Sequence, residues 1–102
     1  MRTTLYVQIE GLSDPTARIL ATLCSGNNQL GKSRWSAPSR VVPIEEVIRG
    51  LRLWLPTMGY TEDGIADFLN PLFWQITNTP DGVAISSSPG ALVNEREVTP
   101  SV

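Results

Sequence analysis

The sequence contains no histidine and only one cysteine. Histidine is the side chain that most often transfers protons near neutral pH, and it completes most catalytic triads and most zinc sites. Cys24 has no second cysteine with which to form an intrachain disulfide and no histidine to act as its base, so we expect a reduced thiol packed in the core. These absences predict a protein that is not an enzyme and that holds no cofactor and no metal ion.

Long apolar runs are missing as well. No stretch approaches the roughly 18 apolar residues that span a bilayer, and the first residues lack the apolar segment of a signal peptide. We therefore expect a cytoplasmic protein that does not enter a membrane. Eight basic and ten acidic side chains give a net charge of -2, which is too small to predict a partner from its sign.

The chain has 102 residues, which is enough for one small domain. We expect residues 1–87 to form a single compact domain and residues 88–102 to form a flexible tail, because proline and glycine interrupt that segment. Hydrophobic periodicity, turn residues and capping residues predict the elements in order: a strand at 3–10, a helix at 14–25, a loop at 26–41, helices at 43–55 and 61–70, and a hairpin at 72–86. Residues 72–77 also fit a continued helix. The fold class expected is α+β, with three short helices packed on a small antiparallel sheet that consists of the C-terminal hairpin, with or without the N-terminal strand.

One short segment, Gly26-Asn27-Asn28-Gln29-Leu30-Gly31-Lys32-Ser33, resembles the Walker A motif of P-loop nucleotide triphosphatases. A working phosphate loop follows a buried strand and opens a helix. Here the preceding segment has a helical pattern, and Pro38 lies five residues after the motif. The resemblance would imply nucleotide binding through residues 26–33, whereas the context favours an ordinary flexible loop.

The predicted element order is similar to that of winged-helix domains, although no sequence signature accompanies it. The resemblance implies a transcriptional regulator whose third helix enters the major groove of DNA. In this chain that helix carries Glu62, Asp63 and Asp67 and no basic residue, so it would repel phosphates. Nucleic-acid binding remains an alternative that these carboxylates disfavour.

A non-catalytic protein-binding module agrees best with these patterns, acting as a regulator, adaptor or inhibitor of a partner protein. The small size also suits a phage or mobile-element protein. The residues expected to bind the partner lie in the basic 26–41 segment and on the acidic helix: Lys32, Arg34, Trp35, Arg40, Glu62, Asp63 and Asp67. Trp35 is open to two interpretations, an interface anchor or a side chain folded back over the helices. Trp54 and Trp74 are expected in the core or at its edge.

Overall fold

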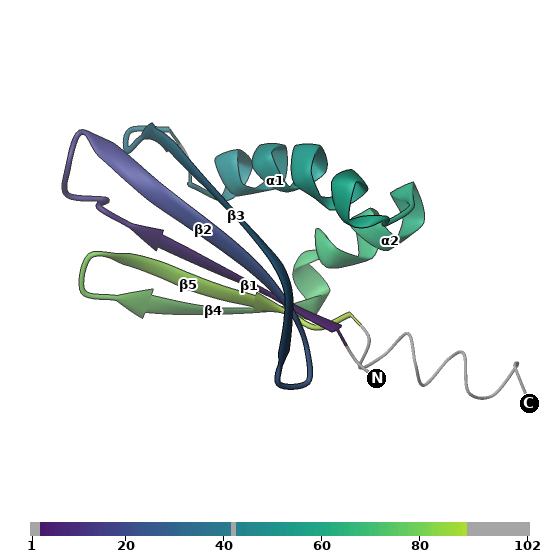
Figure 1. Cartoon of the computed structure of the whole chain (residues 1–102). Coiled ribbons are helices and arrows are strands. Elements are labelled where there is room, and N and C mark those ends of the chain that lie inside the picture. Colours follow the sequence, from purple (N-terminus) through teal and green to yellow (C-terminus); the bar gives the residue numbers. More distant parts are fainter. Residues whose placement is uncertain (1–2, 42, 90–102) are drawn as a thin grey trace, which may run out of the picture.

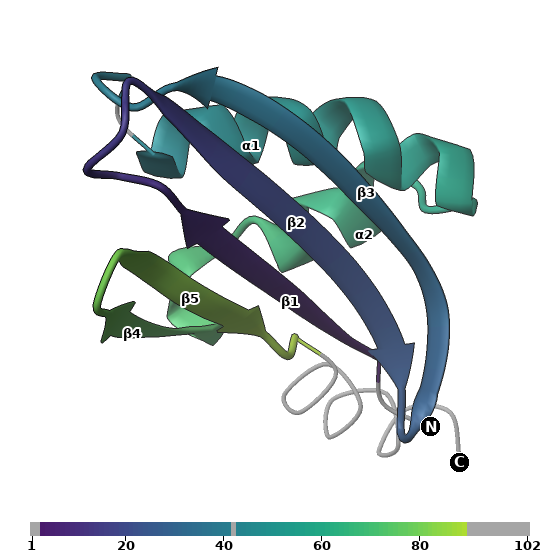
Figure 2. The same cartoon turned by 60° about the vertical axis from the view of Figure 1, so that its left-hand side comes forward.

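The computed structural model describes residues 3–41 and 43–89. The elements in chain order are β1 (Thr3–Glu10), β2 (Thr16–Ser25), β3 (Asn28–Pro38), α1 (Pro43–Trp54), the 3-10 helix η1 (Leu55–Met58), α2 (Glu62–Phe68), the 3-10 helix η2 (Pro71–Phe73), β4 (Trp74–Thr79) and β5 (Gly82–Ser87). The strands form one five-stranded sheet in the order β3-β2-β1-β5-β4, and every neighbouring pair is antiparallel. Both α-helices cover the same face of this sheet, and none of the described residues forms a helix on the opposite face (Figures 1 and 2).

The α+β class and several elements agree with the sequence-based predictions. The predicted N-terminal strand forms β1 and joins the C-terminal hairpin, because β1 pairs with β5 as well as with β2. The predicted helix at 43–55 forms α1. Thr61 caps α2, since its side chain accepts a hydrogen bond from the backbone of Gly64 at 3.2 Å. Residues 72–77 belong to η2 and β4, so the strand interpretation of this segment holds for most of it.

The predicted helix at 14–25 and the predicted loop at 26–41 are both wrong. Residues 16–25 form β2, in which Ala17, Ile19, Ala21 and Leu23 are buried and face the helices. Leu20 and Cys24 are also apolar but lie on the other side of the strand, and they created the helical spacing that suggested a helix. Most of the expected loop is β3, which pairs with β2 along nearly its whole length. The described part of the chain therefore has two α-helices instead of three, and its element order is not that of a winged-helix domain.

The core lies between the sheet and the two helices. Every second residue of β1 points toward the helices, as the strand period requires. The buried apolar set is Leu5, Val7, Ile9, Ala17, Ile19, Ala21, Leu23, Ala37, Val47, Leu51, Leu55, Phe68, Leu69 and Ile85. Trp54 and Trp74 are half-buried against this core, as predicted. Cys24 is a half-buried free thiol on the uncovered side of β2, so its predicted place in the core is wrong.

The C-terminal end of the described chain remains attached to the domain. The backbone N–H of Ser88 donates to the carbonyl of Phe73 at 3.2 Å, and the hydroxyl of Ser88 donates to Thr4 Oγ1 at 3.2 Å. Pro89 is buried. The rest of the expected tail, residues 90–102, lies outside the described residues.

Candidate functional site: the edge strand β3 and the surfaces beside it

The uncovered face of the sheet is built from the residues of each strand that point away from the helices. Tyr6 lies near its centre on β1, with 47% of its surface exposed, between Thr22 of β2 and Ser86 of β5. In the next row Gln8 lies between Leu20 and Ala84. Most of these side chains are small or uncharged, so this face offers hydroxyl and amide groups around a single exposed aromatic ring.

The unpaired basic charges of this face lie on β3, at one edge of the sheet. Lys32 lies opposite Thr22 and Arg34 lies opposite Leu20, and both side chains point away from the helices. Within the part of the chain that the structure describes, neither has an ion-pair partner. Arg40 is exposed in the turn that follows β3. The basic charges of β3 are therefore available to an external group.

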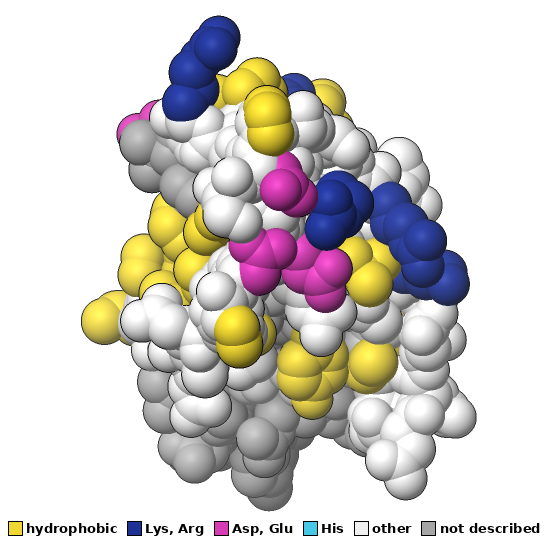
Figure 3. Space-filling view, turned by 90° about the vertical axis from the view of Figure 1, so that its left-hand side faces the viewer, with side chains coloured by type: hydrophobic (Ala, Val, Ile, Leu, Met, Phe, Trp, Pro, Cys, Tyr) yellow, Lys and Arg dark blue, Asp and Glu magenta, His cyan; other side chains and the backbone are white. Residues whose placement is uncertain are grey.

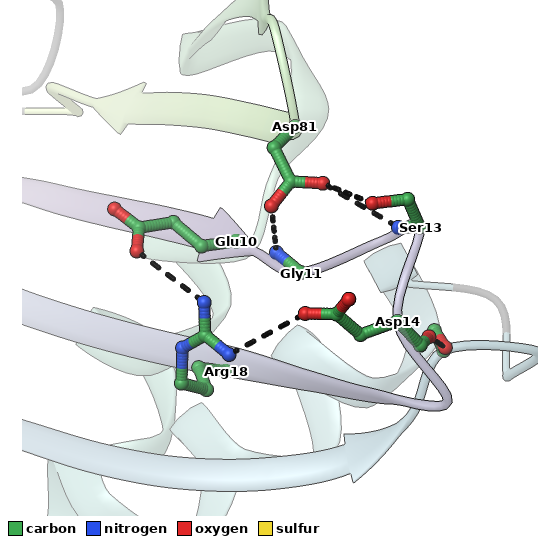
Figure 4. A network of polar contacts seen from close by, with 7 residues as sticks. Glu10, Gly11, Ser13, Asp14, Arg18 and Asp81 are labelled. Carbon is green, nitrogen blue, oxygen red and sulfur yellow. Dashed lines mark hydrogen bonds and ion pairs between the residues drawn. The ribbon is translucent and has the colours of Figure 1, made fainter.

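A shallow hollow of about 430 Å³ lies on the uncovered face next to β3. Its lining residues come from the first three strands: Gln8, Glu10, Arg18, Ile19, Leu20, Arg34, Trp35 and Ser36. Arg18 makes ion pairs with Glu10 at 4.0 Å and with Asp14 at 3.8 Å (Figure 4). These exposed pairs stabilise the fold little, but they leave Arg34 as the uncompensated charge at the hollow.

A polar clasp, formed by Gly11, Ser13 and Asp81, joins the β1–β2 and β4–β5 turns at one end of the sheet. Figure 3 looks at this end, where acidic side chains lie beside basic ones. Asp81, in the β4–β5 turn, accepts hydrogen bonds from Ser13 Oγ at 2.8 Å and from the backbone N–H of Gly11 at 3.0 Å (Figure 4). These hydrogen bonds, that of Ser13 most of all, lower the pKa of Asp81 below its ordinary value. The clasp ties the two turns together and fixes the ends of β1 and β5.

A second groove, of about 320 Å³, lies on the other side of β3, between this strand and α1. Its lining residues are Ser33, Trp35, Arg49, Gly50, Leu53, Trp54 and Thr57. Trp35 packs directly against Gly50 of α1, where a Cβ atom would come within 2.3 Å of the indole ring. The Nε1 atom of Trp35 is buried and has no hydrogen-bond acceptor among the described residues. A buried indole N–H without a partner is uncommon in folded proteins.

Arg49, at the edge of the groove, is held by a neighbouring acid. It forms an ion pair with Glu46 one turn earlier on α1. The hydrogen bond to Arg49 lowers the pKa of Glu46, and the hydrogen bond to Glu46 raises the pKa of Arg49. This pair neutralises much of the charge of Arg49, so the groove itself is mainly apolar.

The structure brings together only some of the residues predicted to bind a partner. Lys32 and Arg34 share the uncovered side of β3, whereas Trp35 faces α1, so the folded-back interpretation of Trp35 describes its position. Glu62, Asp63 and Asp67 belong to α2, which lies in the helix layer, and they are not part of the uncovered sheet face. Sequence reasoning missed Tyr6, Arg18, Leu20 and Leu53. Strand periodicity in residues 16–25 and 28–38 would have placed Arg18, Leu20, Lys32 and Arg34 on one face.

The Walker A-like segment does not form a phosphate loop. Its first residues make the tight turn between β2 and β3, and its last residues belong to β3. Lys32 and Ser33 are adjacent in this strand and point to opposite faces of the sheet, so they cannot meet one phosphate group together. No helix begins at Ser33, and its backbone amides therefore lack the arrangement that binds phosphate.

The described residues show neither a metal-binding cluster nor a membrane-spanning helix. Within residues 3–41 and 43–89, histidine, cysteine, aspartate and glutamate side chains form no group of three or more that could hold a metal ion. None of the described helices is long and apolar enough to cross a membrane.

No protein-family model matches the chain, and neither a curated protein nor a solved structure shows significant similarity to it.

Proposed function

We propose that this chain is a non-catalytic protein-binding module that regulates, links or inhibits a partner protein through β3. The observation that carries this proposal is the position of β3 at the edge of the sheet. The strand has eleven residues, and in the described structure only β2 pairs with it. An edge strand of this length presents a row of unpaired backbone groups that another chain can use.

The surfaces on both sides of β3 support the same function. The open side combines Leu20, Tyr6 and Arg34, and arginine and tyrosine are enriched where protein interfaces bind most strongly. The helix side adds the apolar groove at α1. Because the two hollows lie on either side of the same strand, a folded partner or one of its segments could cover both together with the edge.

Nucleic acid is a less favourable partner for the same face. Only one aromatic ring is exposed there, and binding of single strands usually relies on several stacking rings. Glu10 and Asp14 compensate Arg18, so few cations remain to contact phosphates. This balance of charge favours a protein surface over a phosphate backbone.

A capture experiment with matched charge reversals tests the proposal. The full chain, Arg34→Glu and Arg52→Glu are immobilised, and the proteins that each retains from a native lysate are quantified by mass spectrometry. Arg52 is exposed on α1 outside the groove lining, so its reversal changes net charge equally without touching β3. We expect one protein to be retained in similar amounts by the full chain and by Arg52→Glu, and the amount retained by Arg34→Glu to be lower by about tenfold or more. Equal retention by all three forms, or retention of no protein, would contradict the proposal.

A further inference from the structure

The edge of β3 and the groove beside it have the geometry of a site for an extended peptide. α1 crosses the covered side of the sheet near β3 (Figures 1 and 2), and Trp35 of β3 packs on Gly50 of α1. A peptide that adds a strand to a sheet edge obtains affinity from main-chain hydrogen bonds. Its alternate side chains then point to the two faces, and pockets on those faces provide specificity.

The charges of β3 define what kind of peptide fits. Lys32 and Arg34 are two residues apart, so both point to the uncovered face at the spacing of alternate residues in an added strand. Carboxylates at every second position of a peptide would lie across from them. Opposite charges on facing strands stabilise the pairing, and like charges oppose it.

The same charges disfavour a second copy of this chain as the occupant. In an antiparallel pairing of two β3 strands centred on Ser33, Lys32 of each copy would lie opposite Arg34 of the other. The new strand pair would therefore contain two contacts between like charges, which destabilise it. Lysine on an edge strand is a recognised way in which proteins prevent this kind of self-association.

The other face of an added strand would meet the groove at α1. Leu53 is 68% exposed at this groove, and Trp54 and Thr57 line it beyond Leu53. An apolar side chain of the peptide would cover this surface. Trp35 also lines the groove, but its indole N–H is buried and takes no part in this contact.

We infer that β3 binds an extended acidic segment of a partner protein, which adds to the sheet as a sixth strand. Its carboxylates face Lys32 and Arg34, and an apolar side chain between them occupies the groove at Leu53. This inference rests on the proposed function, because it names the part of the partner that the module holds.

The test uses a fluorescent ten-residue peptide that alternates glutamate with valine, and anisotropy reports its binding to the full chain. We expect saturable binding below about 1 mM, weakened by about tenfold or more in Arg34→Glu and unchanged within about twofold in Arg52→Glu. Leu53→Ser should also weaken binding, whereas Leu72→Ser should not. Leu72 is an equally apolar side chain, 85% exposed on η2, and is not part of the groove.

Modified probes separate strand addition from simple charge attraction. Two further peptides keep the carboxylates in place but carry N-methyl groups, one on every glutamate and the other on every valine. In an added strand only alternate residues direct their N–H groups toward β3, so one of these two peptides should not bind. A peptide that alternates lysine with valine should not bind. Unchanged binding of both methylated peptides, preference for the lysine peptide or for ten-residue oligothymidylate, or no binding at about 1 mM would overturn the inference.

Two outcomes distinguish this inference from the broader proposal. If Arg34→Glu abolishes capture of a lysate protein but the glutamate peptide does not bind, the module function stands and the acidic-strand inference fails. If sedimentation shows a dimer of the full chain that Arg34→Glu strengthens, because the new carboxylate would lie opposite Lys32 of the other copy, a second copy occupies the edge, and the inference is overturned.

Discussion

Gly50→Ala tests whether Trp35 is packed on α1 in the way that shapes the groove. Replacing glycine by alanine inside a helix normally stabilises it by about 1 kcal/mol, because alanine loses less conformational freedom on folding. At Gly50, however, the added Cβ would lie 2.3 Å and 2.4 Å from two carbons of the Trp35 ring, well inside the 3.4 Å at which ordinary contact begins. The indole or the helix must therefore move.

The two opposing effects give the expected size of the change. Inserting a methyl group into a closely packed contact costs about 1–3 kcal/mol, which outweighs the gain in helix propensity. The net effect should be a fall in the free energy of unfolding of up to about 2 kcal/mol, instead of the usual gain. For a domain of this size, each kcal/mol corresponds to a fall in Tm of about 4–8 °C.

Gly64→Ala supplies a matched control in the other helix. A Cβ at Gly64 would have its nearest neighbour at 3.5 Å, which is ordinary contact, so this substitution should stabilise the protein by about 0.5–1 kcal/mol. Urea unfolding followed by circular dichroism measures both variants. In the Trp35→Ala background the clash is absent, and Gly50→Ala should then become stabilising. Equal stabilisation by Gly50→Ala and Gly64→Ala in the native background would refute the packing of Trp35 on α1.

Three further changes test the clasp and the sheet. Because its hydrogen bonds lower the pKa of Asp81, the stabilisation that they provide is fully present above the ordinary value of 3.8 and is lost as pH falls through the lowered pKa. Asp81→Asn should therefore lower Tm at neutral pH and reduce the fall of Tm below about pH 4, whereas Asp63→Asn on α2 should leave Tm at neutral pH nearly unchanged; identical melting curves for the two variants would contradict the clasp. Gly82→Ala would place a Cβ 1.7 Å from a backbone carbonyl oxygen of β1. We expect chemical denaturation to show a free energy of unfolding lower by about 3 kcal/mol or more, and an unchanged denaturation midpoint would contradict this close approach. Ser87→Ala removes a buried hydrogen bond of 2.8 Å to the carbonyl of Phe68, which still accepts a hydrogen bond from the indole N–H of Trp74. The same assay should therefore show a free energy of unfolding lower by only about 1 kcal/mol. A decrease above about 3 kcal/mol would mean that the carbonyl depends on Ser87 alone.

The parts of the fold that the sequence predicted are those whose signals are local. The alternation of β1, the turn before β5 and the cap at Thr61 each depend on a few neighbouring residues, and each was identified correctly. In β2 the apolar residues lie on both faces, because Leu20 belongs to the uncovered side, and the combined pattern fits a helix as well as a strand. Pairing with β1 and β3 decides between them, and that pairing joins residues far apart in the sequence.

The candidate site was hidden for a related reason. β3 contains glycine, lysine, serines and a terminal proline, which are typical of loops and are also the residues that edge strands carry to avoid aggregation. Its two basic residues were recognised as candidates, but their common face became visible only once the segment was known to be a strand. The acidic residues of α2 looked equally suitable in the sequence, although α2 lies in the helix layer on the covered side of the sheet.

The most direct test of the central claim is an NMR titration of the full chain with the alternating glutamate and valine peptide. The account predicts that amide shifts and protection from hydrogen exchange change along residues 28–38 and at Leu53, with little change on α2. Changes confined to α2, or spread over the sheet face without any effect on β3, would show that the edge strand is not where the partner binds.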